Sequence, residues 1–227
     1  SIDGDTDEAP VSKICFDQPF WIGRYEVTNA AYGSAGEFGG NDYPREEVSW
    51  FDAKAFCERR DLRLPTEAEW EFAARGAGGR LYSFEGAIDS SRANYYGSKD
   101  PFDAPSTALA TTPVGYYDGG IHGSPGFATT DSPSPYGAYD MTGNVYEWVR
   151  DYYESFGTGF VRDPQGPAIG TYAVFRGGSW SDGVSSWNLR ATVRQNTLGY
   201  GITIGPTVVH RGIRDYIIGF RLARSAQ

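Results

Sequence analysis

Ser179, Asp182 and His210 are the residue types of an acyl-transfer triad, in which a base activates a hydroxyl nucleophile. Such a triad works only when its side chains hold one another in hydrogen-bonding geometry. Nothing in the sequence positions these three together, and Gly177-Gly178-Ser179 has the pattern of a strand end. The sequence therefore predicts no catalytic serine.

Redox and metal chemistry would need cysteines or histidines, of which the chain has two each: Cys15, Cys57, His122 and His210. Metal sites usually show clustered ligands, and neither histidine has a carboxylate at ligand spacing. We expect both histidines in loops or at the surface. Two cysteines allow one disulfide, but their number alone does not show that it forms. Two buried free thiols are favoured, because Cys57 falls on the apolar side of an expected helix.

Acidic residues alternate at the N-terminus, at Asp3, Asp5 and Asp7, followed by Glu8. This spacing is found in calcium loops, but the glycine and the distal glutamate of such a loop are missing. We therefore expect residues 1–8 to form a solvated acidic tail. No internal repeat or clean linker follows, which predicts one domain over residues 9–227.

Charge is unevenly distributed along the chain. The net charge is −9, yet residues 177–227 hold six Arg against two Asp and no Lys or Glu, which gives +4 there and −13 on residues 1–176. An acidic surface argues against nucleic acid as a partner. No apolar run approaches the roughly 20 residues that cross a membrane, so no membrane insertion is expected. Arginine also suits buried pairs with carboxylates, and we expect most of these arginines to be structural.

Few elements are expected to position these residues. Thr28, Ser49 and Thr66 have the type and context of helix N-caps, the last within a Thr66–Glu69 capping box. Alternating apolar residues predict two strands around residues 17–19 and further strands in 139–150 and 172–180. Residues 77–140 are rich in Gly, Pro, Ser and Tyr. A loop this long is unusual in a compact domain, so a bound cation is a candidate for ordering it.

An ordered set of segments resembles the formylglycine-generating-enzyme (sulfatase-modifying factor) family. The segments are 25–29, 44–50, 63–71, 140–148, 176–180, 190–194 and 219–221. The resemblance implies an α+β, C-type-lectin-like fold with few helices, short strands and much irregular loop. It also indicates that Arg176, Arg190, Arg194 and Arg221 are internal.

The family's redox chemistry does not carry over to this chain. Family oxidases use a cysteine pair shortly after the Gly-Gly-Ser motif, where this chain has Trp180-Ser181-Asp182-Gly183-Val184-Ser185-Ser186-Trp187. Copper(I) selects thiolate and thioether donors, which these residues do not offer. Another branch holds iron with histidines, which are too few and too scattered here. We expect neither copper nor iron.

The family's calcium site does map onto this sequence. By resemblance, the side chains of Asp140 and Glu147 and the carbonyls of Gly143 and Val145 would surround a structural Ca²⁺. Carboxylate and carbonyl oxygens are the ligands that this cation prefers. The alternative is that Asp140 caps a turn and Glu147 pairs with an arginine. Asn94 resembles a ligand of a second family site.

A second group with this scaffold is the variable proteins of diversity-generating retroelements. They resemble this chain in ending at a motif like Ile218-Gly219-Phe220-Arg221-Leu222. Adenine mutagenesis of Asn-type codons never yields Lys, Glu, Gln, Met or Trp, and residues 196–218 contain none of these five. By composition, a 23-residue stretch lacks them roughly once in twenty. An ordinary long loop is the alternative explanation.

The sequence therefore predicts a non-enzymatic ligand-binding protein with a variable region at about residues 180–218. Its target would be a protein or a surface ligand, and its location surface-exposed or virion-associated. A divergent oxidase or accessory protein without the cysteine pair is the alternative function. Aromatic, charged and amide side chains of the region are the expected contacts. These are Trp180, Asp182, Ser185, Trp187, Asn188, Thr192, Asn196, Tyr200, His210, Arg211, Arg214 and Tyr216.

Overall fold

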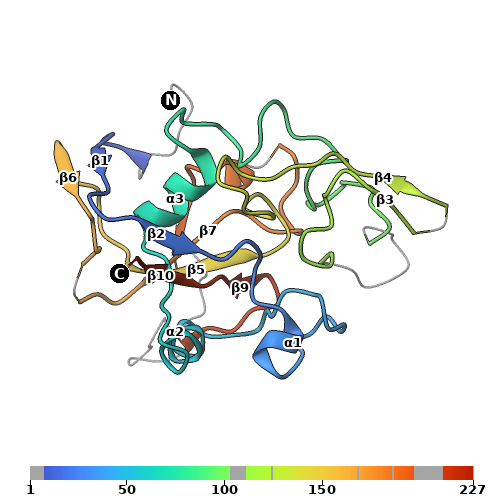
Figure 1. Cartoon of the computed structure of the whole chain (residues 1–227), viewed down its shortest axis with the longest axis horizontal. Helices are drawn as coiled ribbons and strands as arrows, with labels where there is room; N and C mark the ends of the chain where they lie inside the picture. The colour runs from blue at the N-terminus through green and yellow to red at the C-terminus, as the bar shows by residue number, and fades with distance from the viewer. Residues whose placement is uncertain are drawn as a thin grey trace.

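A four-stranded sheet with strand order β8-β7-β5-β9 forms the centre of the computed structural model, which describes residues 8–102, 111–123, 125–167, 169–185, 187–196 and 212–226 (Figure 1). Its strands are β5 Tyr146–Tyr152, β7 Ala173–Arg176, β8 Arg194–Asn196 and β9 Ile218–Phe220. β7 is antiparallel to β5 and β8, whereas β9 is parallel to β5. The sheet gathers strands from distant parts of the C-terminal half of the chain.

Side chains of the sheet alternate between two hydrophobic cores. On β5, Tyr146 and Trp148 pack in the core that contains α2 (Trp50–Glu58), and Val149 packs in the core that contains α3 (Glu67–Arg75). Successive side chains of a strand point to opposite faces, so the two helices cover opposite sides of the sheet. Figure 1 shows α3 above and α2 below the central strands.

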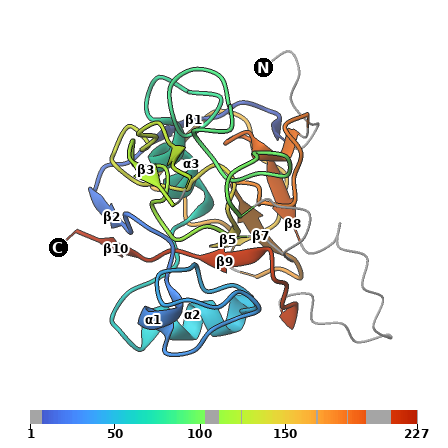
Figure 2. The same ribbon diagram turned by 90° about the vertical axis from the view of Figure 1, so that its right-hand side faces the viewer.

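Three helices begin at the predicted caps. Thr28 caps the short helix α1 (Asn29–Tyr32), and Ser49 and Thr66 form reciprocal capping boxes at α2 and α3. Each cap side chain accepts a hydrogen bond from an otherwise unpaired N–H of the first turn. Figure 2 shows α1 and α2 together on one side of β9.

Short two-stranded ribbons surround the sheet. β1 (Lys13–Cys15) pairs in parallel with β6 (Phe160–Arg162), and β2 (Phe20–Ile22) pairs antiparallel with β10 (Ala223–Ser225). β3 (Ile121–His122) pairs with β4 (Phe127–Ala128), and η2 is a 3₁₀ turn at Trp187–Leu189. The two strands predicted around residues 17–19 exist, but each pairs with the C-terminal half of the chain rather than with the other.

Buried polar side chains order much of the long loop region before β5. Asp100 is 3% exposed and accepts hydrogen bonds from Ser98 Oγ, Tyr117 OH and the Phe102 N–H at 2.7, 2.8 and 2.8 Å. Such satisfied networks fix irregular backbone without a core strand. A cation is not needed to explain the order of this part of the loop.

The two cysteines differ in their surroundings. Cys57 is buried in α2, and burial raises the pKa of its thiol to about 12. Cys15 is only half-buried on β1, with its Sγ 3.5 Å from an Asp17 carboxylate oxygen. Both thiols are free. The prediction of two buried thiols is therefore correct for Cys57 and wrong for Cys15, because β1 is an edge ribbon.

Within the described part of the chain, no helix combines the length and the apolar composition needed to cross a membrane.

Candidate functional site

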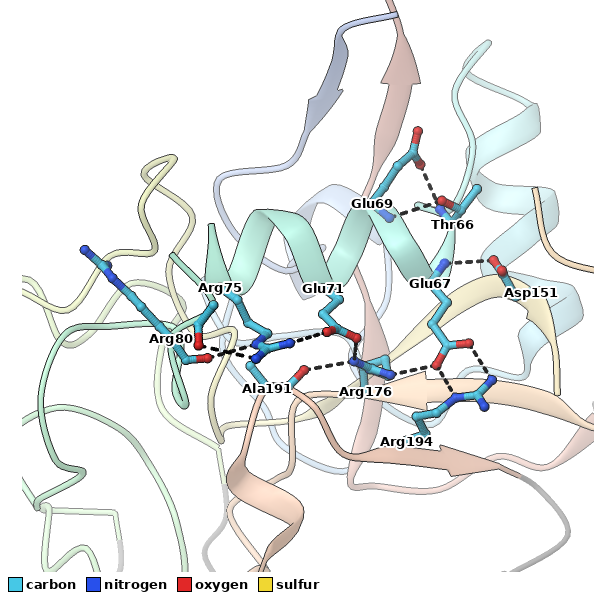
Figure 3. Close-up of polar contacts among 11 residues, drawn as sticks. Thr66, Glu67, Glu69, Glu71, Arg75, Arg80, Asp151, Arg176, Ala191 and Arg194 are labelled. Carbon is cyan, nitrogen blue, oxygen red and sulfur yellow. Dashed lines mark hydrogen bonds and ion pairs between the residues drawn. The ribbon is translucent and has the colours of Figure 1, made fainter. Parts of the chain in front are cut away.

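An arginine–glutamate cluster joins the sheet to α3. It lies where the chain leaves β7 and enters the candidate binding loop, the predicted variable region of about residues 180–218. Arg176 at the end of β7 donates to Glu67 and Glu71 of α3, both at 2.7 Å. Arg194 at the start of β8 donates to both oxygens of Glu67 at 2.7 and 2.8 Å. Figure 3 shows both guanidinium groups pointing at Glu67. Arg176 and Arg194 are buried, as predicted, and they hold the two strands that enter and leave the loop.

Two glycines turn the chain sharply after β7. Gly177 and Gly178 have φ values of 101° and 73°, a region that side chains rarely adopt. A Cβ at Gly178 would lie 2.9 Å from the Asn188 carbonyl oxygen. The Gly-Gly pair therefore allows the backbone of the loop to pack against its own later residues.

Asp182 fixes the start of the loop. Its Oδ2 accepts from the Ser179 N–H and Ser179 Oγ, both at 2.9 Å, and its Oδ1 accepts from Asn188 Nδ2 at 2.7 Å. Gln195 Nε2 then donates to Asn188 Oδ1 at 2.9 Å. Asp182 and Asn188 were predicted as ligand contacts, and the structure places them in this supporting network. Ser179 serves the same network and has no histidine beside it among the described residues.

A ring cluster of Phe38, Trp180 and Tyr216 lies next to this network. Trp180 stacks on Tyr216 with ring centroids 5.9 Å apart, and Phe38 meets both rings edge-on at 5.9 and 6.3 Å. Tyr216 is 47% exposed, and the indole N–H of Trp180 has no hydrogen-bond partner in the described structure. The cluster therefore offers aromatic surface, chiefly the exposed ring of Tyr216, whereas the Trp180 indole nitrogen is itself buried.

Phe38 is a member of this cluster that sequence reasoning missed. It lies in a glycine-rich segment without periodic pattern, so nothing in its local sequence marks it. Glu46 holds the segment by accepting the N–H groups of Glu37 and Phe38, both at 3.0 Å. Burial raises the pKa of Glu46, whose carboxylate these two backbone donors satisfy.

The next stretch of the loop presents exposed side chains. Ser185 is exposed and Trp187 is 48% exposed. Arg190 lies over the Trp187 ring at 4.9 Å and is half-exposed, so the prediction that Arg190 is internal is wrong. Tyr96, 67% exposed, lies alongside because its N–H donates to the Asp182 carbonyl at 2.9 Å. Sequence reasoning also missed Tyr96, since a distant loop brings it there.

The other predicted contacts are placed less uniformly. Thr192 and Asn196 are half-buried, and Arg214 is exposed and pairs with Asp52 at 2.7 Å. The predicted contacts at Tyr200, His210 and Arg211 lie outside the described residues, as does the predicted acidic tail except for Glu8.

A buried carboxylate cluster lies below the loop, at the predicted calcium ligands. Both Glu147 oxygens bond to Arg221, from Nε at 2.5 Å and from Nη2 at 2.6 Å, and one also accepts from Trp70 Nε1 at 2.8 Å. The ion pair with arginine, which was the alternative to metal ligation, is thus present. Asp140 Oδ2 accepts the Gly115 N–H at 2.5 Å. Arg221 is fully buried, as predicted.

The cluster carries more negative than positive charge. Burial raises the pKa of Asp140 to about 6, and that of the neighbouring Glu26 lies well above its ordinary value because of burial and the charges of Asp140 and Glu147. Asp140 fits a calcium ligand, but Glu147 as placed is already saturated by Arg221 and Trp70. Among the described residues, no three His, Cys, Asp or Glu side chains are grouped so as to hold a metal ion. Calcium at Asp140, Gly143, Val145 and Glu147 therefore stays a prediction.

Asn94 packs beside this cluster. Its Nδ2 lies 3.4 Å from Asn144 Oδ1, and its carbonyl accepts the Asn144 N–H at 2.9 Å. Asn144 in turn donates to Glu26 at 2.8 Å. The contacts give Asn94 a structural role, and its role as a ligand of a second metal is not tested by them.

The fold and these clusters match a known family. The sulfatase-modifying factor enzyme 1-like domain matches residues 1–226, and the chain belongs to this FGE-sulfatase family. Its architecture is the C-type-lectin-like fold of that family, with few helices, short strands and much loop. The predicted resemblance is thereby confirmed.

Curated relatives carry varied names. The chain is 32% identical to a serine/threonine-protein kinase pkn1 of Chlamydia pneumoniae over 79% of the chain and 31% of that protein. It is 33% identical to the inactive C-alpha-formylglycine-generating enzyme 2 of Bos taurus over 67% of the chain and 44% of that protein. The chain thus spans less than half the length of either relative. The family includes a member named as inactive.

Two solved structures are similar over most of the chain. The Treponema denticola variable protein 1 has a TM-score of 0.67 and 26% identity, covering 90% of this chain and 84% of its own. PvdO from Pseudomonas aeruginosa has a TM-score of 0.68 and 25% identity, covering 98% and 86%. The scaffold is therefore shared between proteins with different names.

Proposed function

We propose that this protein is a non-enzymatic ligand-binding protein that displays a variable surface on the C-type-lectin-like scaffold, as a retroelement variable protein does. The observation that carries the proposal is the contrast between the two halves of the site. In the arginine–glutamate cluster and the Asp182 network, buried or half-buried polar side chains are held by hydrogen bonds of 2.7–2.9 Å. The side chains beyond them, at the ring cluster, Ser185 and Trp187, are partly or fully exposed and make few fixed contacts.

This contrast is what a binding module needs. Interface energy is dominated by a few aromatic and arginine side chains, and a rigid support keeps their ordering cost low. The exposed Trp187 and Tyr216 and the half-buried Trp180 supply such rings on a supported loop. The target would be a protein or a surface ligand, with the protein surface-exposed or virion-associated.

Composition and similarity support the same proposal. Residues 196–218 lack the five amino acids that adenine mutagenesis of Asn-type codons does not reach. The Treponema denticola variable protein 1 shares the scaffold at 26% identity. The Gly-Gly-Ser motif that opens the loop is followed by no cysteine, and the two cysteines of the chain lie on β1 and α2.

A combined substitution tests the binding function. Ser185 and Trp187 are replaced by all residue types in a display library, with Asp182 replaced in a matched library. The surface library is expected to keep a melting temperature near that of the parent in most clones and to yield binders. The Asp182 library is expected to lose cooperative unfolding in most clones, because it breaks the supporting network. Equal tolerance in both libraries would contradict the proposal.

The genomic locus gives an independent test. A neighbouring reverse transcriptase gene is expected, with a near-copy of the sequence encoding residues 180–218 that differs at adenines. Absence of both would refute the retroelement origin while leaving ligand binding to the library test.

The alternative function is a divergent oxidase or an accessory protein of one. Similarity to relatives named formylglycine-generating enzyme favours it, since the chain is a member of the same family. It predicts cofactor-dependent oxygen consumption with a thiol peptide. We expect none above a control with heat-unfolded protein.

A further inference from the structure

A cavity of about 710 Å³ lies between α3, the end of β5 and the β1–β6 ribbon. Its size falls within the roughly 300–1,000 Å³ of small-molecule sites. None of the predicted contacts from Trp180 to Tyr216 lines it. The cavity is therefore separate from the ring cluster and from the proposed binding loop.

The charged residues around the cavity are unevenly paired. Arg194 and Arg75 line the cavity, but each is already bonded, Arg194 to Glu67 at 2.7 Å and Arg75 to Glu71 at 2.5 Å. The remaining charged side chains in the lining, Asp151 and Glu154, belong to no ion pair in the described structure. Among the described residues, these two acidic side chains thus lack an ion-pair partner, and Arg150 acts on Asp151 through its charge alone.

Asp151 is the more constrained of these two carboxylates. It is 7% exposed, and its Oδ2 accepts the Glu67 N–H at the first turn of α3 at 2.8 Å (Figure 3). Its Oδ1 accepts no hydrogen bond from the described residues. Burial raises the pKa of Asp151 to about 7, with the charge of Glu67 adding to the effect. Burial therefore favours the protonated form of Asp151, and a cationic donor that reaches its free oxygen favours the carboxylate.

Gly166 keeps the free oxygen accessible. It lines the cavity with φ +67°, and a Cβ at this position would lie 2.4 Å from Asp151 Oδ1. Any other residue would press its side chain onto that oxygen. The absence of a side chain at Gly166 therefore leaves space beside Asp151 Oδ1.

Aromatic rings form the apolar part of the wall. Phe16 and Phe72 meet with ring centroids 5.3 Å apart, and Phe156 covers the Arg194 guanidinium at 3.8 Å. Tyr152 also lines the cavity. Such a wall suits an apolar body, and the rings attract cations through their faces.

We propose that this cavity binds a small organic cation, a primary ammonium on an aromatic or aliphatic body, with Asp151 Oδ1 as the partner of the ammonium. The ammonium supplies the donor and the positive charge that Asp151 lacks, and the apolar body packs on the rings. A neutral or anionic ligand of the same shape leaves the charge uncompensated. A bare metal ion is a poorer occupant, because Asp151 is the one buried carboxylate among the described lining residues that has an oxygen free of hydrogen bonds.

The probe for this proposal is 2-phenylethylamine, compared by calorimetry with its neutral isostere 2-phenylethanol and with the anion 3-phenylpropionate. The amine is expected to bind at least about tenfold more tightly than the alcohol, the factor of one charge-assisted hydrogen bond. Asp151→Asn keeps the acceptor for the Glu67 N–H and is expected to weaken amine binding by the same factor. Glu85→Gln, an exposed acid remote from the cavity, is the matched control and is expected to change nothing.

Three results would overturn the proposal: no binding of the amine at millimolar concentration, equal binding of amine and alcohol, or unchanged amine binding by the Asp151→Asn protein. A readout on the unsubstituted protein covers the case in which that variant does not fold. Adding the amine is expected to shift the ¹³C resonance of the Asp151 carboxyl group. An unchanged resonance at saturating amine would equally overturn the proposal that Asp151 binds the ammonium.

Discussion

Removal of the Glu67 charge is expected to destabilise the protein more than any single surface substitution. Glu67 is 4% exposed and accepts three hydrogen bonds from Arg176 and Arg194, which are 0% and 4% exposed. Glu67→Gln leaves these two buried guanidinium groups with one carboxylate, that of Glu71. Breaking a buried ion pair on one side costs about 3–5 kcal/mol.

The corresponding thermal shift is measurable. Each kcal/mol lowers the melting temperature of a domain of this size by about 2–4 °C, so a decrease of roughly 6–20 °C is expected. Circular dichroism or calorimetry at neutral pH measures it. The control is Glu85→Gln, since Glu85 is exposed and lies 3.8 Å from Arg80. Surface pairs are worth about 0–1 kcal/mol, so the control is expected to change the melting temperature little.

A triple variant tests whether the lower melting temperature of Glu67→Gln comes from the unpaired buried charges or from poorer packing of the replaced side chains. Glu67→Leu, Arg176→Met and Arg194→Met together remove the buried charges, and Glu71 keeps its pair with Arg75. Apolar replacement of a buried ion-pair triad is often neutral or stabilising, so this variant is expected to melt well above Glu67→Gln. A decrease of less than about 3 °C for Glu67→Gln, below the range expected for an unpaired buried charge, would refute the reasoning.

Three further predictions follow from the structure. The raised pKa of Asp151, about 7 against an ordinary 3.8, means that its contribution to stability is fully present below pH 3.8 and is lost as the pH rises through 7. Asp151→Asn should therefore gain stability relative to the parent between pH 4.5 and 8, by a few kcal/mol at roughly 1.4 per pH unit, and a constant difference in urea unfolding would contradict this. Gly178→Ala should cost about 1–3 kcal/mol through its positive φ and its close approach to Asn188, whereas Gly183→Ala, whose Cβ would lie at ordinary contact distance, 4.0 Å, from Ser185 Oγ, should cost much less; equal melting temperatures would contradict the strain. If calcium binds at Asp140, millimolar Ca²⁺ should raise the melting temperature by several degrees over EDTA in the parent but not in Asp140→Asn, and identical melting in both solutions would exclude the site.

Local sequence was sufficient for the helix starts and for the sharp turn after β7. A cap joins residues three apart, as Ser49 and Thr66 do, so its chemistry is complete within one short segment. The Gly177-Gly178 pair likewise carries its conformational requirement in its own residue type. The family resemblance extended the prediction from these local features to the whole fold, because the matching segments occur in the same order as in the family.

The predicted calcium ligands show where local sequence reaches its limit. The family resemblance implied Asp140, Gly143, Val145 and Glu147 as a metal loop, and nothing within that segment reveals that Glu147 has another partner. β5 pairs in parallel with β9, and this register sets Glu147 opposite Gly219, two residues before Arg221. Two residues along extended chain return to the same face, so Arg221 reaches Glu147.

Burial of the arginines in the C-terminal segment also depends on tertiary contacts that local sequence does not reveal. Arg176, Arg190, Arg194 and Arg221 look alike in sequence, yet Arg190 lies half-exposed over Trp187. The other three lie against α3 or β5, where carboxylates meet them. For those three arginines, a carboxylate from elsewhere in the fold is brought within hydrogen-bonding reach of the guanidinium group.

The sequence by itself determined the caps, the glycine turn, the order of the family segments and the absence of a cysteine pair after Gly-Gly-Ser. Only the tertiary structure decided that Asp182 and Asn188 support the loop, that Phe38 and Tyr96 border the exposed surface, and that Asp151 lies buried beside a cavity and in no ion pair of the described structure. The physical reason is range. Caps and turns are fixed by neighbours a few residues away, whereas these contacts join segments from 6 to more than 80 residues apart, which the packing of the sheet brings together.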